Sequence, residues 1–366
     1  MKYLSLLIKP VSGMCNMSCR YCFYRELSDD AGGAGAMSRE LCDALIKKAF
    51  SIAEEEVIFA FQGGEPLLAG PSFYRIFIET VNREKGGKKA SYSIQTNGLL
   101  LNEEYEKIFL ENDFLVGISL DGPRKIHDAC RVDHRGEGTF YRVLNQAKKL
   151  AAAGVKVNIL SVVTPKLAEK PEYVYDFFKK QGFAFLQFIP CMDSIRSIQG
   201  EGEDSLKDSQ YLHFLNGLFA CWQKDFRDGN YISIRHFDNW VRMAAGQPGD
   251  TCALSGQCGS YFVIERDGSV YPCDFYVQKE YLLGNIRDDD FQALLARLQE
   301  SGFLTDYKEK LSSDCRECPD YDLCRGGCKR DWVIGERGGR TRYCWALREF
   351  FDANRGALQE IAEIVL

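Results

Sequence analysis

The sequence lacks the features that would place the chain in a membrane or on nucleic acid. No apolar run approaches the roughly 18 residues of a membrane-spanning helix. The first ten residues, MKYLSLLIKP, reach polar side chains too soon for a secretory signal peptide. The 52 Asp and Glu outnumber the 46 Lys and Arg, and this net charge of −6 argues against a broad phosphate-binding surface. We therefore expect a cytoplasmic protein that binds neither nucleic acid nor a membrane.

Internal repeats and low-complexity tracts are also missing. The short stretch AGGAGA at residues 31–36 is expected to be a flexible loop without a repeat behind it. With 45% hydrophobic and 27% charged residues, the composition is that of an ordinary globular protein. A chain of 366 residues is long enough for two domains.

Cysteine, by contrast, is unusually frequent. Fifteen cysteines without an export signal argue against a disulfide framework and favour thiolates that bind metal. Cys15, Cys19 and Cys22 form a C-x3-C-x2-C motif with no histidine between them. A four-iron cluster held by only three thiolates keeps one iron open to an outside ligand. The alternative for this motif is a zinc knuckle that lacks its fourth ligand.

A second group of cysteines lies in the C-terminal third of the chain, where four of them form C-x2-C-x5-C-x3-C. The members of this group are Cys252, Cys258, Cys273, Cys315, Cys318, Cys324, Cys328 and Cys344. Spacing alone does not identify the metal, so the eight cysteines could hold iron–sulfur clusters or two structural zinc sites.

Strand-length apolar segments alternate with amphipathic helix-length segments over residues 4–190. This alternation is typical of βα units with parallel strands, and six right-handed units would curl into a partial barrel. The expected strands are residues 4–9, 57–62, 92–96, 115–120, 156–163 and 185–190. The expected helices are residues 38–54, 71–83, 103–112, 140–153 and 171–181. The sequence therefore predicts an α/β fold with a partial (β/α)6 barrel.

Beyond residue 190 the alternation stops. Residues 193–209 are polar and aperiodic, so we expect a loop over the barrel mouth, followed by a helix at residues 211–226. From about residue 231 the composition shifts toward cysteine and glycine. This shift predicts two domains, residues 1–230 and residues 231–366.

Residues 261–271 are expected to form a short hairpin. Asp267-Gly268 stands where a two-residue hairpin turn favours such a pair. The second strand of this hairpin would deliver Cys273 and Asp274 together.

Several motifs at the ends of the expected strands resemble a known family. The N-terminal cysteine motif, with Tyr21 and Phe23 and the later Gly63-Gly64-Glu65, resembles the radical S-adenosylmethionine enzymes. The C-terminal cysteines resemble the SPASM domain, which carries two auxiliary [4Fe–4S] clusters. The runs that resemble anaerobic sulfatase-maturating enzymes in particular are CFY at 22–24, FQGGEP at 61–66, QTNG at 95–98 and YPCDFY at 271–276.

The resemblance implies S-adenosylmethionine and three [4Fe–4S] clusters as cofactors. The implied ligands are Cys15, Cys19 and Cys22 for the first cluster, Cys252, Cys258, Cys273 and Cys328 for one auxiliary cluster, and Cys315, Cys318, Cys324 and Cys344 for the other. The residues implied to line S-adenosylmethionine are Tyr21, Gly64, Glu65, Ser119, Arg131 and Met192.

Plainer alternatives exist for several of these residues. Gly63-Gly64-Glu65 alone could be a tight turn. Ser119 and Arg131 could be a solvated surface pair. His127 and His134 lie in the same region, and we expect both to be exposed to solvent rather than to bind a metal.

The resemblance also implies an oxidoreductase reaction. A 5′-deoxyadenosyl radical would remove a Cβ hydrogen from a cysteine or serine of a sulfatase, and the product would be Cα-formylglycine. Asp274 resembles the family's general base, and Tyr24 and Gln62 could hydrogen-bond it or the substrate. Asp274 could instead cap a turn. The implied partners are an unfolded or nascent sulfatase segment of the C/S-x-P/A-x-R type and a reductant such as flavodoxin or ferredoxin.

Two other functions fit parts of the sequence. One is another SPASM peptide maturase, which would form thioether or carbon–carbon crosslinks. The other is a non-catalytic zinc-binding adaptor built from the cysteine-rich C-terminus. The mass of the product from a sulfatase peptide separates the first alternative, and anaerobic iron and sulfide analysis separates the second.

Overall fold

The computed structural model describes residues 1–24, 35–194 and 197–365. Most of the expected flexible loop, residues 31–34, and residues 195–196 of the expected loop over the barrel mouth lie outside the described residues. The chain divides into two compact units. The first comprises Met1–Leu120, Arg131–Val157 and Gly259–Leu304, and the second comprises Asp121–Cys130, Asn158–Cys258 and Thr305–Leu366. The expected boundary near residue 231 stays a prediction.

The first unit is built on a sheet whose central strands are parallel. Its strands are β1 (Tyr3–Ile8), β2 (Glu56–Phe61), β3 (Lys89–Thr96), β4 (Leu115–Ser119), β8 (Phe262–Ile264), β9 (Ser269–Tyr271) and β10 (Gly284–Asn285). Their order in the sheet is β10-β9-β8-β1-β2-β3-β4. The strands from β8 to β4 run parallel to one another, whereas β9 and β10 are antiparallel additions. The segment after residue 258 therefore returns to pair with the first strand of the chain.

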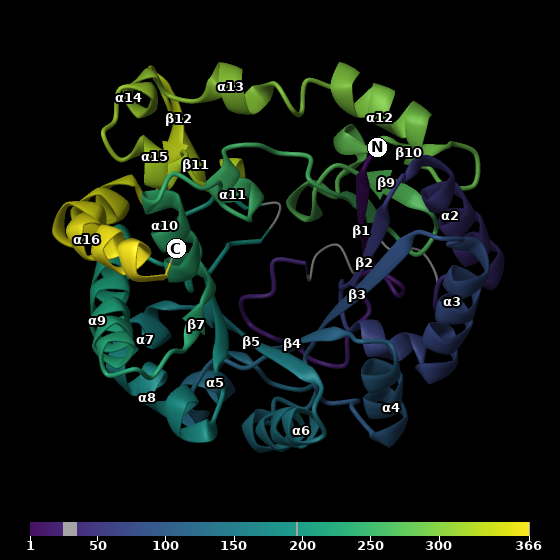
Figure 1. Ribbon diagram of the computed structural model, residues 1–366, viewed down its shortest axis with the longest axis horizontal. Helices are drawn as coiled ribbons and strands as arrows, with labels where there is room; N and C mark the ends of the chain where they lie inside the picture. Colours follow the sequence, from purple (N-terminus) through teal and green to yellow (C-terminus); the bar gives the residue numbers. More distant parts are fainter. Residues whose placement is uncertain (25–34, 195–196, 366) are drawn as a thin grey trace. The chain divides into compact units, whose positions relative to one another are not determined.

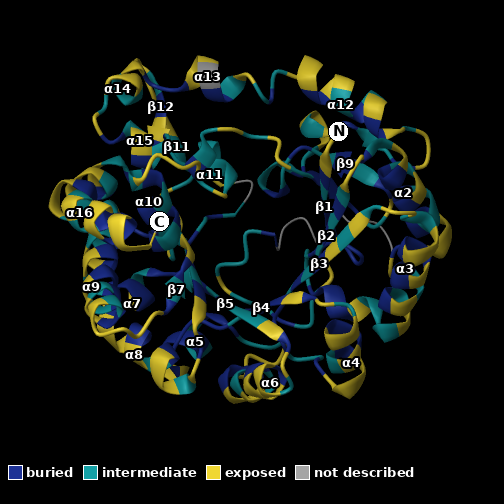
Figure 2. Ribbon diagram, in the orientation of Figure 1, coloured by how far each residue is buried: buried dark blue, intermediate teal, exposed yellow. Residues whose placement is uncertain are grey.

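Helices follow the parallel strands of this unit. They are α2 (Arg39–Ile52), α3 (Pro71–Glu84), α4 (Glu103–Glu111), α6 (Phe140–Ala152) and α12 (Phe291–Glu300), with short 3-10 turns η1 (Pro66–Ala69), η2 (Asp274–Tyr276) and η3 (Lys279–Tyr281). The helices α2, α3 and α4 lie on one side of β1, β2 and β3 (Figure 1). Their exposed residues lie mainly on the side away from these strands, and each of the strands carries several buried residues (Figure 2). This is the arrangement expected for amphipathic helices that cover a parallel sheet.

Local capping explains where several helices begin and end. Ser38 precedes α2, and its side chain accepts a hydrogen bond from the Leu41 amide. Asn102 caps α4 in the same way through the Tyr105 amide, at 3.1 Å. In the second unit, α8 (Pro171–Gln181) begins with proline and ends at Gly182, which has a left-handed φ of 81°. These are the residue types that helix ends favour.

The second unit contains three parallel strands and most of the remaining helices. The strands are β5 (Lys156–Val163), whose first two residues belong to the first unit, β6 (Phe185–Pro190) and β7 (Ser233–Ile234), in the order β5-β6-β7. The helices besides α8 are α5 (Arg124–Cys130), α7 (Pro165–Ala168), α9 (Asp208–Arg227), α10 (Arg235–Ala244), α11 (Cys252–Ser255), α13 (Asp306–Lys310), α14 (Ser313–Arg316), α15 (Tyr321–Cys324), the 3-10 turn η4 (Lys329–Asp331) and α16 (Cys344–Val365). A separate antiparallel hairpin joins β11 (Trp332–Gly335) to β12 (Gly338–Thr341).

The elements expected from the sequence are present. The six expected strands correspond to β1 to β6, and the five expected helices correspond to α2, α3, α4, α6 and α8. The expected hairpin is β8–β9, with Gly268 at a φ of 91° in its turn. No helix among the described residues is long and apolar enough to cross a membrane.

Candidate functional site

The N-terminal cysteine motif lies on a loop after β1 in the first unit. Cys15, Cys19 and Cys22 are all partly buried. The side-chain amide of Asn97, from the end of β3, reaches the sulfur of Cys15 at 3.8 Å. Burial raises the pKa of the Cys15 thiol to about 12, so a metal that binds this sulfur must displace its proton. Three sulfurs with an amide donor beside one of them suit an iron–sulfur cluster, whose sulfurs are tuned by hydrogen bonds.

His134 fastens this loop from outside. Its Nε2 lies 3.0 Å from the Cys15 carbonyl oxygen, and its Nδ1 lies 2.9 Å from the Ser18 hydroxyl. Because a carbonyl oxygen only accepts, Nε2 donates to the Cys15 carbonyl. His134 is exposed, as expected. The same expectation is wrong for His127, which is buried on α5 in the second unit and accepts a hydrogen bond from a backbone amide.

The glycine-glycine-glutamate turn docks onto the cysteine loop through its backbone. The Gly64 amide donates to the Ser12 carbonyl at 2.8 Å, and the Glu65 amide donates to the Met14 carbonyl at 2.7 Å. A Cβ on Gly64 would collide with the Met14 carbonyl oxygen, so only glycine allows this approach. The segment is a turn, as the plainer alternative holds, and it also supports the loop that carries Cys15.

Glu65 links the turn to the end of β3. Its buried carboxylate accepts hydrogen bonds from the Leu67 amide at 3.0 Å, the Thr96 hydroxyl at 2.7 Å and the Asn97 amide at 2.8 Å. Burial nevertheless raises its pKa to about 7. A carboxylate held this firmly is suited to receive the ammonium group of a ligand.

Three other residues expected to line S-adenosylmethionine lie in the first unit. The Arg131 guanidinium is buried and stands 5.4 Å from the ring centroid of Tyr21. Ser119, at the end of β4, accepts a hydrogen bond from the Gln95 side chain at 2.9 Å. Arg131 is therefore not a solvated surface residue, whereas Ser119 is only partly buried.

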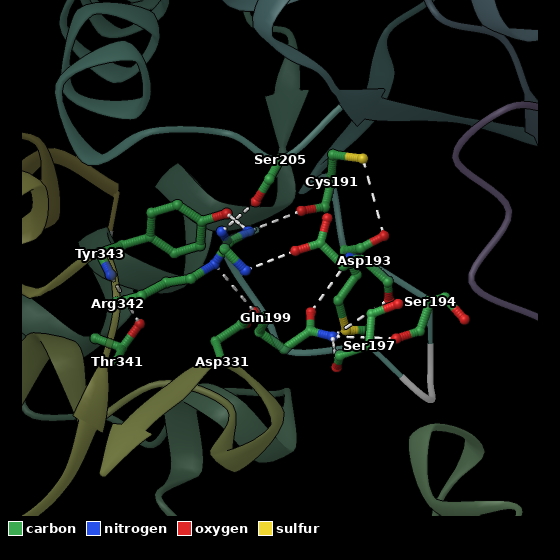
Figure 3. Close-up of polar contacts among 12 residues, drawn as sticks. Cys191, Asp193, Ser194, Ser197, Gln199, Ser205, Asp331, Thr341, Arg342 and Tyr343 are labelled. Atoms are coloured by element: carbon green, nitrogen blue, oxygen red, sulfur yellow. Dashed lines mark hydrogen bonds and ion pairs between the residues drawn. The ribbon is translucent and has the colours of Figure 1, made fainter. Parts of the chain in front are cut away.

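Met192 follows β6 in the second unit, on a segment that a buried arginine holds in place. The guanidinium of Arg342 donates to the Cys191 carbonyl at 3.0 Å and to the Ser205 hydroxyl at 2.6 Å (Figure 3). Burial raises the pKa of the neighbouring Asp331 carboxyl to about 6. Arg342 thereby contacts a residue on each side of Met192, namely Cys191 and Ser205.

Asp274 lies in a buried charged cluster of the first unit. Its carboxylate forms an ion pair with the ammonium of Lys9, which directly follows β1. The Gln62 amide approaches the other carboxylate oxygen at 3.4 Å. The Tyr24 hydroxyl donates to Glu265, and burial together with the carboxylates of Glu265 and Asp274 raises the pKa of Tyr24. Asp274 is the first residue of η2, whose N-cap residue is Cys273.

Four C-terminal cysteines surround one pocket of the second unit. Helical ends supply three of them, since Cys315 lies in α14, Cys324 ends α15 and Cys344 begins α16. Together with Cys318 they line this pocket. A set of four thiolates can hold a four-iron cluster or a tetrahedral zinc ion. Among the residues that the structure describes, no three cysteine, histidine or carboxylate side chains converge on a single metal ion.

The remaining four expected ligands are divided between the units. Cys252 begins α11, and Cys258 and Cys328 lie in the same second unit. Burial raises the pKa of Cys258 to about 11. Cys273 belongs to the first unit, where its sulfur lies 3.8 Å from the Tyr261 hydroxyl.

Sequence reasoning missed Lys9, Glu265, Asn97, His134 and Arg342 as parts of these arrangements. The sequence could have indicated Asn97, because this residue lies in the QTNG run. Lys9 also carried a signal, because a lysine that ends a buried apolar strand is unusual. The other three offer no local pattern.

Comparisons with known proteins agree with this geometry. The model of the radical SAM superfamily matches residues 10–178, and the SPASM model, described as an iron–sulfur cluster-binding domain, matches residues 252–319. These matches confirm the expected fold class, a partial (β/α)6 barrel with a C-terminal SPASM domain. They also favour iron–sulfur clusters over the zinc alternative.

Relatives match over the full length of the chain. The cysteine-type anaerobic sulfatase-maturating enzyme of Clostridium novyi (strain NT) is 42% identical over 370 residues, which cover 99% of this chain and 98% of the relative. The serine-type enzyme of Bacteroides thetaiotaomicron is 32% identical, with 90% of this chain and 83% of the relative covered. The solved structure of native anSMEcpe with bound AdoMet and the Kp18Cys peptide gives a TM-score of 0.93 at 38% identity, covering 99% of this chain and 100% of that chain.

Proposed function

Because the chain belongs to the anaerobic sulfatase-maturating enzymes of the radical S-adenosylmethionine superfamily, we propose that it oxidises a sulfatase cysteine to Cα-formylglycine. The curated relatives with 40% identity or more are cysteine-type enzymes, which supports cysteine over serine as the preferred substrate. The peptide would be an unfolded or nascent segment of the C-x-P-x-R type. The reaction would take place in the cytoplasm with flavodoxin or ferredoxin as the reductant. The chain would consist of two domains, residues 1–230 and residues 231–366.

The proposal assigns the cofactors to residues that suit them. Cys15, Cys19 and Cys22 would hold the cluster that binds S-adenosylmethionine, and the C-terminal cysteines would hold two auxiliary clusters in the sets implied by the resemblance. When bound, these groups supply a 5′-deoxyadenosyl radical that takes one Cβ hydrogen atom and a site that accepts one electron. The residues that would contact S-adenosylmethionine are Tyr21, Gly64, Glu65, Ser119, Arg131 and Met192.

The chain's own side chains would handle the proton. Loss of a hydrogen atom from Cβ, a proton from the thiol and one electron converts the cysteine into a thioaldehyde. Water then replaces the sulfur, and hydrogen sulfide leaves with formylglycine as the product. Asp274 would accept the thiol proton, while Gln62 and Tyr24 would orient this carboxylate or the thiol. Burial of Asp274 keeps water from competing for its oxygens.

The observation that carries this proposal is the buried carboxylate of Asp274 directly after Cys273. A proton acceptor and an expected cluster ligand at consecutive positions would let the proton and the electron leave the substrate close together. A turn residue without a chemical role would not need the ion pair with Lys9.

The test uses anaerobically reconstituted protein, S-adenosylmethionine, a reductant and two peptides that contain C-x-P-x-R or S-x-P-x-R. We expect the cysteine peptide to lose about 18 Da and the serine peptide to lose about 2 Da, because oxidation removes two hydrogens and hydrolysis exchanges sulfur for oxygen. The cysteine peptide should react faster. Unchanged masses of both peptides, with 5′-deoxyadenosine still formed, would contradict the proposal.

A further inference from the structure

Lys9 is a fully buried lysine, with 0% of its side chain exposed to solvent. Lysine is almost never buried completely unless its charge is paired, because removal of an ammonium from water is costly. Here the Lys9 ammonium contacts the Asp274 carboxylate and lies 3.8 Å from the Glu265 carboxylate. Both carboxylates are also buried, at 4% and 7% exposure. The pairing explains how the charge is tolerated, but not why a charge stands at this position.

The chain makes room for this side chain at a specific point. Gly63 lies beside Lys9, and a Cβ on Gly63 would stand 2.6 Å from the Ser12 carbonyl oxygen and 3.2 Å from both the Cβ and the Cγ of Lys9. Gly63 also has a φ of 121°, a conformation that residues with side chains rarely adopt. The backbone of Lys9 is fixed by a hydrogen bond of 2.8 Å to the Ile264 carbonyl. The glycine turn therefore supports the cysteine loop through Gly64 and admits the lysine through Gly63.

The ammonium is held from more than one side. It lies 3.5 Å from the ring centroid of Tyr24, a close cation–π contact. The Tyr24 hydroxyl in turn donates to Glu265, so the ring that covers Lys9 is itself anchored. A long, flexible side chain has little freedom left in such surroundings.

We propose that Lys9 is a positioning residue that sets the orientation of the Asp274 carboxylate toward the substrate. This inference rests on the proposed function, in which Asp274 accepts the thiol proton. Lys9 contacts Oδ1 of Asp274, and the Gln62 amide approaches Oδ2 at 3.4 Å. Two different groups therefore fix the two oxygens, and rotation of the carboxylate would break both contacts. A misplaced acceptor would leave the substrate radical without a route for its proton.

The test compares Lys9→Met, Lys9→Arg and the full-length wild type. Methionine is similar in length to lysine but carries no charge. The substitution therefore removes the buried ion pair and leaves the Asp274 carboxylate without its partner. We expect 5′-deoxyadenosine formed per formylglycine to rise about 10- to 100-fold in Lys9→Met, the scale of a group misplaced by about an ångström. The KM for the peptide should stay within about twofold, since Asp274 acts in the reaction rather than in binding. Lys9→Arg should restore part of the coupling.

The matched control is Lys48→Met in the same unit. The Lys48 ammonium donates to the backbone carbonyls of Ile286 at 2.6 Å and Asp289 at 2.9 Å, so it also satisfies partly buried polar groups. Its loss should lower the melting temperature and leave the ratio of 5′-deoxyadenosine to formylglycine at the wild-type value. Iron content and the electron paramagnetic resonance signal of the iron–sulfur clusters are measured for each variant.

The outcomes separate this inference from the proposed function. A wild type that makes no formylglycine removes the proposed function, whereas an active wild type with a fully coupled Lys9→Met of normal iron content removes only the role of Lys9. If Lys9→Met does not retain iron, Lys9→Arg tests whether Lys9 positions Asp274. Arginine keeps the positive charge but places its nitrogen atoms differently from the lysine ammonium. A wild-type ratio in an iron-replete Lys9→Arg then overturns the inference, and a raised ratio supports it.

Discussion

Two cysteine sites, each contained in one unit, are held by different means. The cysteines at 15–22 lie on a loop that backbone hydrogen bonds from Gly64 and Glu65 support from outside. The four cysteines around the pocket of the second unit lie at or near the ends of α14, α15 and α16. Three ligands leave a coordination position open for a reactant, and four ligands close a site. The proposed open site thus depends on neighbouring strand ends, whereas the proposed closed site is shaped by its own helices.

The largest expected effect comes from removal of the open site. Replacement of Cys15, Cys19 and Cys22 by alanine should abolish 5′-deoxyadenosine formation, because no iron remains to bind S-adenosylmethionine. Iron analysis should fall from about 12 to about 8 atoms per chain, since three four-iron clusters become two. If this variant still cleaved S-adenosylmethionine, the cysteines at 15–22 would not hold the cluster that binds it.

The next effect concerns a residue outside both sites. Asp274→Asn should keep S-adenosylmethionine cleavage but lower formylglycine formation by about 100-fold or more, the scale expected for loss of a general base. Asp267→Asn, an exposed change on the same hairpin, serves as the control and should leave the rate unaltered. Product mass spectrometry and chromatography of 5′-deoxyadenosine measure the two rates. An Asp274→Asn enzyme as fast as the control would dismiss this carboxylate as the base.

A smaller effect is expected at the closed site. Cys324→Ser should lose about four iron atoms per chain while 5′-deoxyadenosine formation persists, because the open site keeps its ligands. The melting temperature should fall, since metal binding contributes to the folding free energy of such sites. Calorimetry and iron analysis test this expectation. Complete loss of S-adenosylmethionine cleavage, with iron retained at the open site, would contradict the separation of the two sites.

The smallest effect is a pH dependence of stability. Burial raises the pKa of Glu65 to about 7, against 4.5 for an ordinary glutamate. A raised pKa favours the folded state while the group is protonated, so this contribution is present below pH 4.5 and is lost as the pH rises to about 7. The melting temperature of the metal-free protein should therefore fall by a few degrees from pH 5 to pH 8. Glu65→Gln should flatten this trend, and the exposed control Glu300→Gln should not.

The sequence allowed prediction of what local patterns encode. The alternation of apolar and amphipathic segments predicted β1 to β6 to within a few residues, because each strand carries several buried residues. The Asp267-Gly268 turn was predicted for the same reason, since its geometry depends on two adjacent residues. The cysteine spacing identified candidate metal ligands before any fold was known.

What could not be predicted depends on pairing between distant segments. Lys9 meets Asp274 only because β8 returns to lie beside β1, and no spacing in the sequence records this neighbour. His127 was misjudged because nothing in its local sequence indicates that its ring is buried, where it accepts a hydrogen bond from the Asp121 amide. Arg342 resembles any other arginine of the C-terminal region until its partner carbonyl at Cys191 is known.

The pairing of β1 with β8 has an evolutionary consequence. Leu6 pairs with Phe262 and Ile8 with Ile264, in parallel register. Because neighbouring residues of a strand face opposite sides, an insertion of one residue within β8 would turn its later side chains around. Insertions and deletions are therefore expected to accumulate in the loops before Gly259 or after Tyr281. The stretch between them should keep its length even where its amino acids are substituted.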